Sequence, residues 1–404
     1  MVKIAVLGYG TVGSGVVGVI QTNAGSIARH VGDEVVVKYV LDLREFPGDP
    51  VEKILVHDYD VILQDPEVRV VVETMGGVNP AYDFTKRALQ AGKSVCTSNK
   101  ELVAQHGVEL MQTAADNHVN YMFEASCGGG IPIIRAMNEA LTADVIDGVA
   151  GILNGTTNYI LTKMTEEGSE FADALAEAQE KGYAERNPEA DVEGYDACRK
   201  IAILSSVAYG SHVDFSEVYT EGISKITATD IRYAKAMGKA IKLLAVSRKE
   251  GSAVAIRVTP VLIGPDDPLY AVNDVFNAVL VHGNMLGDAM FYGSGAGSLP
   301  TASAVTADVV SCAKNLNRNI AVPGTGEKLE VMPFEETESC FFVRVSGDPA
   351  ERMEEITALF GKAKTIAADG VEGEFGFITG SVKEKEFAEK ISGLDGVLNR
   401  VRVM

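Results

Sequence analysis

Apolar residues in the first third of the chain form short runs of strand length, and these runs alternate with segments of helical period. The first run, VKIAVL at residues 2–7, is followed by a glycine-containing turn and a helical pattern that continues to Ile20. Strand and helix alternating in this way predict an α/β fold built on a mostly parallel, doubly wound sheet. Further strands are predicted over 35–41, 68–73, 94–97 and 119–123, with a helix over 80–91 among them.

From about Gly128 the pattern changes to longer helices mixed with strands, which predicts a second part of α+β type. Near residue 293 the stretch GSGAGSLPTASAV opens an apolar helix to about Asn315, and we expect this helix to return to the first part. The predicted helices of the second part are 171–181, 194–209 and 230–246, and its predicted strands are 147–153 and 253–260.

Residues 320–337 contain two prolines and two glycines and are typical of a linker. From Cys340 onwards the pattern predicts a small module with the order strand, helix, strand, strand, helix, strand. We therefore expect three domains, of which the first is completed by a returning segment. Their predicted ranges are 1–130 with 296–320, 131–295, and 338–404.

The charge of the chain narrows the class of partner. With a formal net charge of −20, the protein should be repelled by nucleic acid and by anionic membranes, so a small-molecule substrate is the better expectation. The five cysteines show no CxxC spacing, which argues against a zinc site and a disulfide framework. The chain has no run of ~18 apolar residues, so no membrane-spanning segment is expected. The cysteine pattern makes the reducing cytoplasm the expected compartment.

The segment GYGTVG, at residues 8–13, lies between the first strand and its helix, where a dinucleotide-binding turn belongs. The three glycines allow a tight turn, close approach of the pyrophosphate and close packing of the helix. Asp42, at the end of the second strand, is placed to bind the adenine ribose, whereas Arg44 beside it would suit a 2′-phosphate. The residues therefore favour NAD over NADP only weakly.

The segment FEASCGGGIP leaves open the roles of its cysteine and of its glycine run. Cys127 could act as a nucleophile next to a glycine-rich turn. A small apolar side chain that packs in the core is the better interpretation, because no partner for the thiol is evident. The run Gly128 to Gly130 more readily exposes backbone carbonyls, which could hold a monovalent cation or simply permit tight packing.

The segment GYAERNPEADVEGYDACRK, residues 182–200, is rich in charge and could be a solvated loop or part of an active site. A helix beginning near residue 193 would place Asp196 and Lys200 at the head of an otherwise apolar stripe with Ile203 and Val207. Ionic groups on such a stripe are costly to bury and therefore suggest a function. Lys100, just after the strand at 94–97, lies at the edge where open α/β sheets bind ligands.

Taken together, these motifs resemble the homoserine dehydrogenases. The matching segments cover almost all of residues 1 to about 315 in order, and they include GYGTVGSGVV, GKSVCTSNKELVA, FEASCGGGIPII, GILNGTTNYIL, AQEKGYAERNPEADVEGYDACRKIAIL and FYGSGAGSLPTASAV. The resemblance implies reduction of L-aspartate 4-semialdehyde to L-homoserine with NAD(P)H, on the pathway to threonine and methionine. It also implies a catalytic and dimerisation role for 131–295, and a homodimer or homotetramer.

The resemblance carries over to individual residues. It makes Lys100 and Lys200 the paired active-site lysines and Asp196 their partner carboxylate. Two lysines side by side would lower each other's pKa. The implied substrate-binding residues are Glu185, Tyr183, Gly155 and Thr156. The implied cofactor-binding residues are Gly8, Gly10, Thr11, Val12, Gly13, Asp42, Arg44, Thr97 and Gly295. A sodium ion would be held by the backbone carbonyls of Glu124, Cys127, Gly129 and Ile131.

The carboxyl-terminal module resembles an ACT domain, which in relatives can sense an amino acid. Here the usual acidic residue and glycine turn after its first strand are replaced by SGDPAERM, so we expect threonine to inhibit weakly or not at all. We expect no kinase segment before residue 1, as in the monofunctional type. Two other functions stay open at this point: a phosphorylating aldehyde dehydrogenase that uses Cys127, and a non-catalytic nucleotide sensor.

Overall fold

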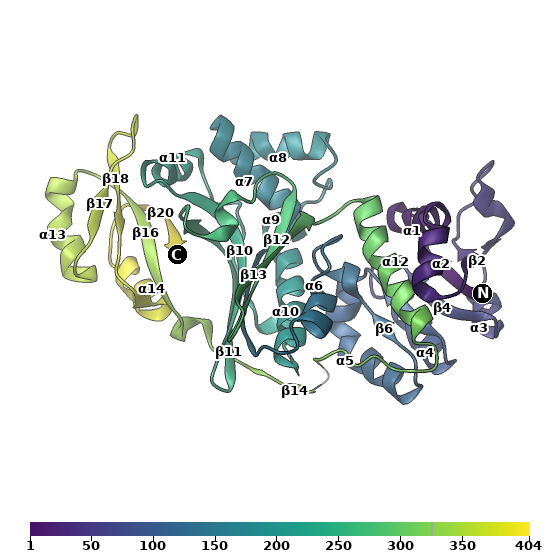
Figure 1. Ribbon diagram of the computed structural model, residues 1–404. Helices are drawn as coiled ribbons and strands as arrows, with labels where there is room; N and C mark the ends of the chain where they lie inside the picture. Colours follow the sequence, from purple (N-terminus) through teal and green to yellow (C-terminus); the bar gives the residue numbers. More distant parts are fainter. Residues whose placement is uncertain (325) are drawn as a thin grey trace.

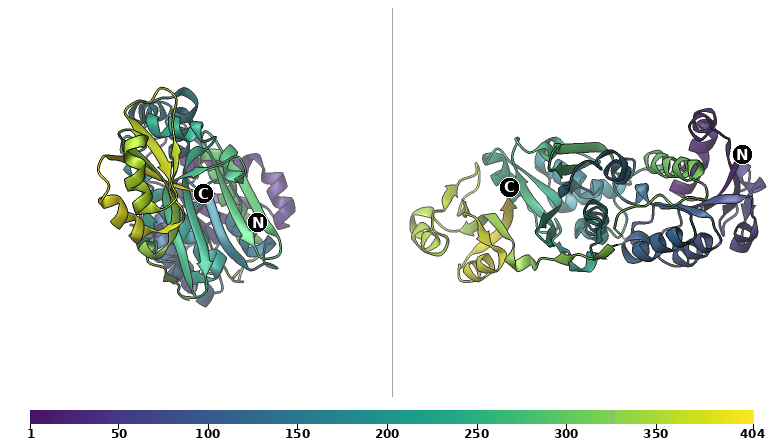
Figure 2. Two further views of the ribbon diagram at one scale, coloured as in Figure 1. Left: turned by 90° about the vertical axis from the view of Figure 1, so that its left-hand side faces the viewer. Right: turned by 60° about the horizontal axis from the view of Figure 1, so that its bottom comes forward.

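The computed structural model describes residues 1–324 and 326–404, and its three parts lie in a row (Figure 1). The amino-terminal part occupies one end, the carboxyl-terminal module the other, and the largest part lies between them. Figure 2 shows the same elongated arrangement from a second direction. Among the described residues, we find no helix with both the length and the apolar surface needed to cross a bilayer.

The amino-terminal part is built on a six-stranded parallel sheet, as the sequence pattern predicts. Its strand order, β3-β2-β1-β4-β5-β6, reverses direction between β1 and β4, which is where such sheets bind ligands. The last strand is shorter than predicted. The strands are β1 (Val2–Leu7), β2 (Val35–Leu41), β3 (Leu55–Val56), β4 (Val68–Glu73), β5 (Ser94–Thr97) and β6 (Tyr121–Met122).

Helices cover both faces of this sheet, because successive side chains of each buried strand point to opposite sides. Ala5 and Leu7 belong to the core under α4 and α5, whereas Ile4 and Val6 belong to the core under α1. The helices are α1 (Thr11–Thr22), α2 (Ala24–Val31), α3 (Tyr59–Gln64), α4 (Ala81–Gln90) and α5 (Lys100–Asp116).

A helix from late in the chain completes the second of these cores. In α12 (Ser298–Lys314), Val305 and Val309 are buried together with Val16 and Val17 of α1. The two helices approach closely at Gly15, where a Cβ atom would lie 3.0 Å from that of Ala302. The predicted return of this segment to the first part is therefore seen directly (Figure 1).

The middle part is a large mixed sheet with helices packed on it. Five of its strands are antiparallel neighbours in the order β13-β12-β7-β10-β11, with β13 at the edge. These strands are β7 (Ile146–Ile152), β10 (Ala240–Glu250), β11 (Ala253–Ile263), β12 (Phe276–Gly283) and β13 (Gly287–Ser294). The helices are α6 (Ile133–Arg135), α7 (Gly155–Glu167), α8 (Phe171–Glu180), α9 (Glu189–Val192), α10 (Tyr195–Tyr209) and α11 (Ala228–Ala236).

The helix predicted over 230–246 is wrong. Helix α11 ends at Ala236, Gly238 has a left-handed φ of 67°, and β10 begins at Ala240. The first six residues of β10 are all buried, so the strand has no alternation of apolar and polar residues. Such a run cannot be told from a buried helix by its period alone.

The carboxyl-terminal module has the predicted order of elements, with one short strand, Val382–Lys383, added before its second helix, and it joins the middle sheet. Strand β20 runs parallel to β11, with Val261 opposite Arg402. Buried Arg402 also forms ion pairs with Glu384 (2.6 Å) and Glu221 (2.7 Å), of which Glu221 belongs to the middle part. The elements are β16 (Glu338–Ser346), α13 (Pro349–Phe360), β17 (Lys364–Ile366), β18 (Glu374–Ile378), β19 (Val382–Lys383), α14 (Glu384–Ser392) and β20 (Val397–Val403).

Candidate active site

Helix α10 presents a buried ion pair in its first two turns. Oδ2 of Asp196 lies 2.7 Å from Nζ of Lys200, and both side chains are buried. Ile203 and Val207 continue the same stripe into the apolar core, as the sequence pattern predicts. The charged segment that contains this pair is therefore not a solvated loop at these two positions.

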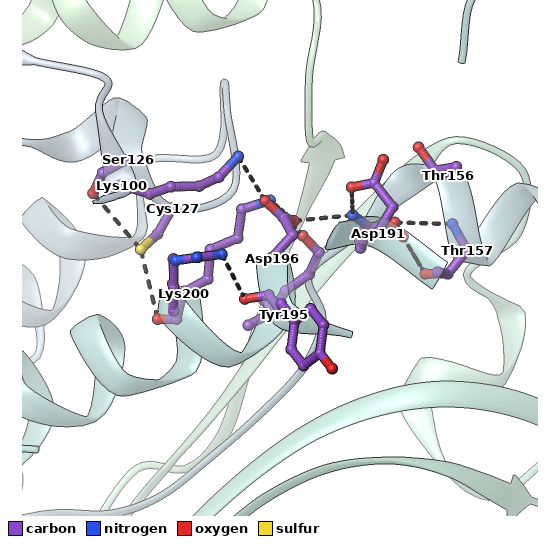
Figure 3. A network of polar contacts seen from close by, with 12 residues as sticks. Lys100, Ser126, Cys127, Thr156, Thr157, Asp191, Tyr195, Asp196 and Lys200 are labelled. Atoms are coloured by element: carbon purple, nitrogen blue, oxygen red, sulfur yellow. Dashed lines mark hydrogen bonds and ion pairs between the residues drawn. The ribbon is translucent and has the colours of Figure 1, made fainter. Parts of the chain in front are cut away.

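Lys100 reaches the same carboxylate from the amino-terminal part of the fold. It is the first residue of α5, directly after β5, and Nζ lies 2.6 Å from Oδ1 of Asp196. Asn99 caps this helix by accepting a hydrogen bond from the N–H of Leu102. Asp196 thus lies between two lysines that come from different parts of the fold (Figure 3).

The charges around this carboxylate shift the pKa of Asp196 and of Lys100. Burial alone would raise the pKa of Asp196, but the charges of Lys200 and Lys100 hold it well below its usual value. The pKa of Lys100 is raised by the charge of Asp196, against the effect of burial. The expectation that the two lysines would lower each other's pKa is therefore wrong for Lys100, because a carboxylate separates them.

Two further residues belong to this network and were not assigned from the sequence. Nδ2 of Asn154 donates hydrogen bonds to Oδ1 of Asp191 (2.7 Å) and to Oδ2 of Asp196 (2.9 Å). Lys200 in turn donates to the backbone carbonyl of Leu153 (2.8 Å). A signal was present, since Asn154 is a polar residue between a buried strand and a glycine.

A cavity of about 620 Å³ opens beside the network, between the six-stranded sheet and the middle part. It brings together all four residues predicted for the substrate and two of those predicted for the cofactor, Val12 and Gly295. The residues that line it include Val12, Ser98, Lys100, Gly129, Asn154, Gly155, Thr156, Tyr183, Glu185, Asp191, Asp196, Lys200, Val275 and Gly295.

The predicted substrate residues lie on one wall of this cavity. Gly155 begins α7, and a Cβ atom there would lie 2.7 Å from the carbonyl oxygen of Val275, so the close approach favours glycine. Thr156 donates through Oγ1 to the carbonyl oxygen of Tyr183 (2.6 Å), which ties this helix to the segment that carries Glu185. Glu185 is exposed and free to meet a ligand.

The turn at residues 8–13 has the form that a dinucleotide requires. Gly8 has a left-handed φ of 89°, and a side chain on Gly13 would collide with the Gly8 carbonyl. At Gly10 no atom lies within 4 Å of the place where a Cβ would be, so the backbone there is open to a phosphate. Thr11 and Val12 begin α1.

The predicted ribose residues lie near this turn. Asp42 accepts hydrogen bonds from the N–H of Tyr9 (2.8 Å) and from the exposed side chain of Arg44 (2.9 and 2.8 Å). These bonds keep the pKa of Asp42 below its usual value, and the bond from Arg44 has the largest effect. Thr97, by contrast, is fully buried and donates to Glu73 (2.6 Å), so its hydroxyl does not line the cavity.

The turn at residues 124–131 lies beneath the cavity and packs against the loop that carries Gly295. Gly128 and Gly129 have left-handed backbone, and a side chain on Gly129 would collide with the Gly295 carbonyl. Cys127 is fully buried, with Sγ 3.6 Å from the Lys200 carbonyl (Figure 3). Burial raises the pKa of this thiol to about 12, which disfavours a thiolate nucleophile.

Comparison with known proteins finds the same family along most of the chain. Residues 8–124 match the family described as "Homoserine dehydrogenase, NAD binding domain", and residues 132–310 match "Homoserine dehydrogenase". A homoserine dehydrogenase of Neisseria gonorrhoeae is 39% identical over 98% of this chain and 95% of its own length. One from Bacillus subtilis is 43% identical over 79% of this chain and 74% of its own.

Solved structures agree with these matches. The crystal structure of a homoserine dehydrogenase from Thiobacillus denitrificans has a TM-score of 0.90 at 36% identity, covering 100% of this chain and 98% of that chain. A hyperthermophilic archaeal homoserine dehydrogenase in complex with NADPH has a TM-score of 0.66 at 29% identity, covering 77% of this chain and 97% of that chain.

Proposed function

Because the chain belongs to the homoserine dehydrogenase family, we propose that Lys100, Asp196 and Lys200 carry the proton chemistry of its reaction. The enzyme interconverts L-aspartate 4-semialdehyde and L-homoserine by hydride transfer with NAD(P)H, a step toward threonine and methionine. One observation carries the assignment of these residues. Asp196 is buried at the wall of the cavity with a lysine ammonium group on each of its oxygens.

The reaction needs positive charge beside the carbonyl oxygen, and the two lysines can provide it. When the aldehyde carbon accepts a hydride, the carbonyl oxygen becomes an alkoxide that needs a cation or a proton donor beside it. The ammonium groups of Lys100 and Lys200 would supply the positive charge, and one of them would donate the proton. Asp196 would hold both ammonium groups in place and would keep that of Lys100 charged.

The amino-acid end of the substrate needs partners of its own. Asp196 is already engaged by two lysines and Asn154, so Glu185 and Asp191 are the better candidates to bind the substrate ammonium group. Thr156, Gly155 and Tyr183 lie on the same wall as Glu185 and would orient the carboxylate.

The coenzyme fits the open turn at residues 8–13, where no side chain fills the space above Gly10. The nicotinamide supplies or accepts the hydride when it is bound. Asp42 would accept hydrogen bonds from an unmodified ribose and oppose a 2′-phosphate, so we propose that NAD(H) is used at least as well as NADP(H). A kcat/KM more than tenfold higher with NADP(H) would show that Arg44 decides the choice.

A sodium ion fits the turn at residues 124–131. The proposed ligands are the backbone carbonyls of Glu124, Cys127, Gly129 and Ile131, which are hard oxygen donors of the kind such an ion prefers. Within the described residues, the carbonyls of Cys127 and Gly129 accept no hydrogen bond, which leaves them free to coordinate. The ion would stiffen the turn that packs against Gly295.

We further propose that the enzyme assembles as a homodimer or homotetramer through the open face of its middle sheet. Strand β13 lies at the edge of that sheet and exposes Met290 and Tyr292, and the turn before it exposes Met285 and Leu286. Exposed apolar side chains in one place commonly mark an interface. Light scattering coupled to size-exclusion chromatography would test the assembly.

The cytoplasm remains the proposed location. All five cysteines are free thiols in the structure, and even the pair Cys96 and Cys312 keeps its sulfur atoms 3.6 Å apart. Free buried thiols suit a reducing compartment. Fractionation of cells that carry the native protein would test this location.

A single assay tests the central proposal. Homoserine-dependent reduction should be measured with NAD and with NADP, in the presence and absence of inorganic phosphate. Turnover without phosphate is the expected result, and it would eliminate an acylating mechanism through Cys127. Absence of homoserine oxidation with both nucleotides would instead support a nucleotide sensor.

A further inference from the structure

The side-chain amide of Asn154 accepts a hydrogen bond through its oxygen and donates hydrogen bonds through its nitrogen, and the two atoms have different partners. It lies between β7 and α7 and is almost fully buried. Oδ1 accepts a hydrogen bond from the N–H of Thr157 (2.9 Å), which caps α7. The two N–H groups of Nδ2 are donated to Asp191 (2.7 Å) and Asp196 (2.9 Å).

The orientation of this amide follows from its neighbours. If the amide were turned over, Oδ1 would face two carboxylates and Nδ2 would face a backbone N–H. Both contacts would be repulsive, so the network allows one orientation only. A buried neutral group thus separates two buried or half-buried carboxylates and satisfies an oxygen of each.

The same turn also holds the lysine. Leu153, the residue before Asn154, accepts a hydrogen bond from Nζ of Lys200 through its backbone carbonyl (2.8 Å). Lys200 and Asp196 are therefore fixed to consecutive residues of one turn as well as to each other. Oδ2 of Asp196 is shared between Lys200 and Asn154, whereas Oδ1 is left for Lys100.

We propose that Asn154 is a positioning residue, which orients Asp196 so that each of its oxygens faces one lysine and which holds Asp191 apart from Asp196 at the substrate. This inference rests on the proposed roles of Lys100, Asp196 and Lys200. Asn154 lines the cavity, but its hydrogen-bonding groups are already used by protein atoms, so it acts through the two carboxylates.

Substitution to aspartate separates the two roles of this side chain. Asparagine and aspartate cap helices about equally well, so Asn154→Asp keeps the cap of α7. It removes both donated N–H groups and places a third carboxylate against Asp191 and Asp196. Asn154→Ser likewise keeps a capping oxygen and removes the amide donors. Asn154→Ala removes both roles.

The experiment measures kcat for homoserine oxidation, the Kd of the nucleotide and the Tm of each variant. We expect Asn154→Asp and Asn154→Ser to lower kcat by about 10- to 100-fold, since each lost bond to a charged group carries roughly that effect. Their nucleotide Kd should stay within about twofold of wild type, because a capping oxygen is retained and the hydrogen bonds of Asn154 go to Thr157, Asp191 and Asp196 rather than to the turn at residues 8–13. Asn154→Ala should lose both kcat and Tm. Asn23→Asp makes the same change at an exposed site and should leave all three values unchanged.

Two results would overturn the inference. If Asn154→Asp and Asn154→Ser keep more than half of the wild-type kcat, Asn154 serves only as a helix cap. If both lose as much Tm as Asn154→Ala, the loss of kcat reflects damage to the fold. Lys200→Met, measured in parallel, separates this inference from the proposed function. A fully active Lys200→Met would remove the proposed role of the lysine pair itself.

Discussion

Asp196 accepts hydrogen bonds or ion pairs from three side chains, Lys100, Lys200 and Asn154, although it is almost completely buried. A carboxylate in such surroundings is expensive to bury unless every partner is present. The partners come from α5, α10 and the turn before α7. Removing any one of them should therefore disturb the position of Asp196, and removing either lysine should also raise its pKa.

Lys200→Ala tests the proposed role of this lysine in the reaction. We expect kcat for homoserine oxidation to fall by about 10²–10³, by analogy with the loss of a donor to a developing oxyanion. The nucleotide Kd should barely change, because the turn at residues 8–13 belongs to another part of the chain. Steady-state kinetics and nucleotide titration would measure both effects. Activity above about a tenth of wild type would leave Lys100 as the sole candidate for proton transfer.

Three further substitutions accompany this variant, and two of them, Glu189→Gln and Cys127→Ser, are controls. Glu189→Gln alters an exposed carboxylate of the same charged segment that does not line the cavity, and it should remain near wild type. Asp196→Asn should lower kcat strongly, because it removes the charge between the lysines. Cys127→Ser should keep much of its activity, since the buried thiol has a raised pKa and no thioester forms.

The direction of the reaction should respond to pH. The pKa of Lys100 is raised by the charge of Asp196, so the neutral amine that could accept the hydroxyl proton of homoserine is scarce at neutral pH. Homoserine oxidation should therefore accelerate as the pH rises into the alkaline range, while aldehyde reduction, which needs the charged ammonium group, should persist at neutral pH. A pH profile of kcat in both directions measures this. Oxidation that is equally fast at about pH 7 and about pH 9 would contradict a lysine base.

At this scale the sequence predicted the charged residues better than their neutral partner. Asp196 and Lys200 head an apolar helical stripe, and that conflict between charge and burial is visible without a structure. Asn154 gives no such conflict, because an asparagine before a helix is an ordinary cap. Its second role depends on Asp191 and Asp196, which lie far along the chain and meet it only in the folded protein.

Among the elements, the turn between β1 and α1 shows how glycines divide their tasks. A side chain on Gly13 would collide with the Gly8 carbonyl, whereas the space above Gly10 is open. One glycine is therefore required by the fold, and the other only by what the turn has to bind.

Gly10→Ala and Gly13→Ala separate these two requirements. Gly10→Ala should keep the Tm close to that of wild type and weaken nucleotide binding, because the new methyl group occupies the space above the backbone. Gly13→Ala should lower the Tm as well, since α1 has to move away from β1. Thermal unfolding and nucleotide titration distinguish the two variants. Equal loss of Tm in both would show that the space above Gly10 is needed for folding.

Except for the short strand β3 (Leu55–Val56), the strands of the first sheet were predictable because each buried run is bounded by a turn, as at Val2–Leu7. Strand β10 was not, because its buried half lacks the alternation that marks a strand and follows α11 after only three residues. Its identity is decided by pairing with β7 on one side and β11 on the other. Such tertiary pairing leaves no signal in a local window.

At the scale of the whole molecule, the carboxyl-terminal module and the middle part share one sheet, and Arg402 ties them together. Its guanidinium group is buried between Glu384 of the module and Glu221 of the middle part. Arg402→Met should lower the free energy of unfolding by about 3–5 kcal/mol, because it removes the partner of buried Glu384 and leaves Arg400 (3.5 Å) as the remaining cation beside Glu221. Chemical denaturation would measure this loss. Exposed Arg318→Met is a suitable control.

Regulation through the module is expected to be weak. Its first strand, β16, is followed by Gly347 and by Asp348, which caps α13, in place of the acidic residue and glycine turn described above. Threonine should therefore inhibit homoserine oxidation weakly or not at all when the activity is titrated with this amino acid. A tight and cooperative response that disappears on truncation near Glu338 would contradict this expectation.

The return of α12 to the first sheet also determines when that sheet can be finished. Val16 and Val17 of α1 are covered by Val305 and Val309, so their partners leave the ribosome almost three hundred residues later. At typical rates of synthesis this delay lasts about 15–60 s. Throughout that time an apolar face of the nascent nucleotide-binding part has no covering helix, and it is a natural surface for a chaperone to protect.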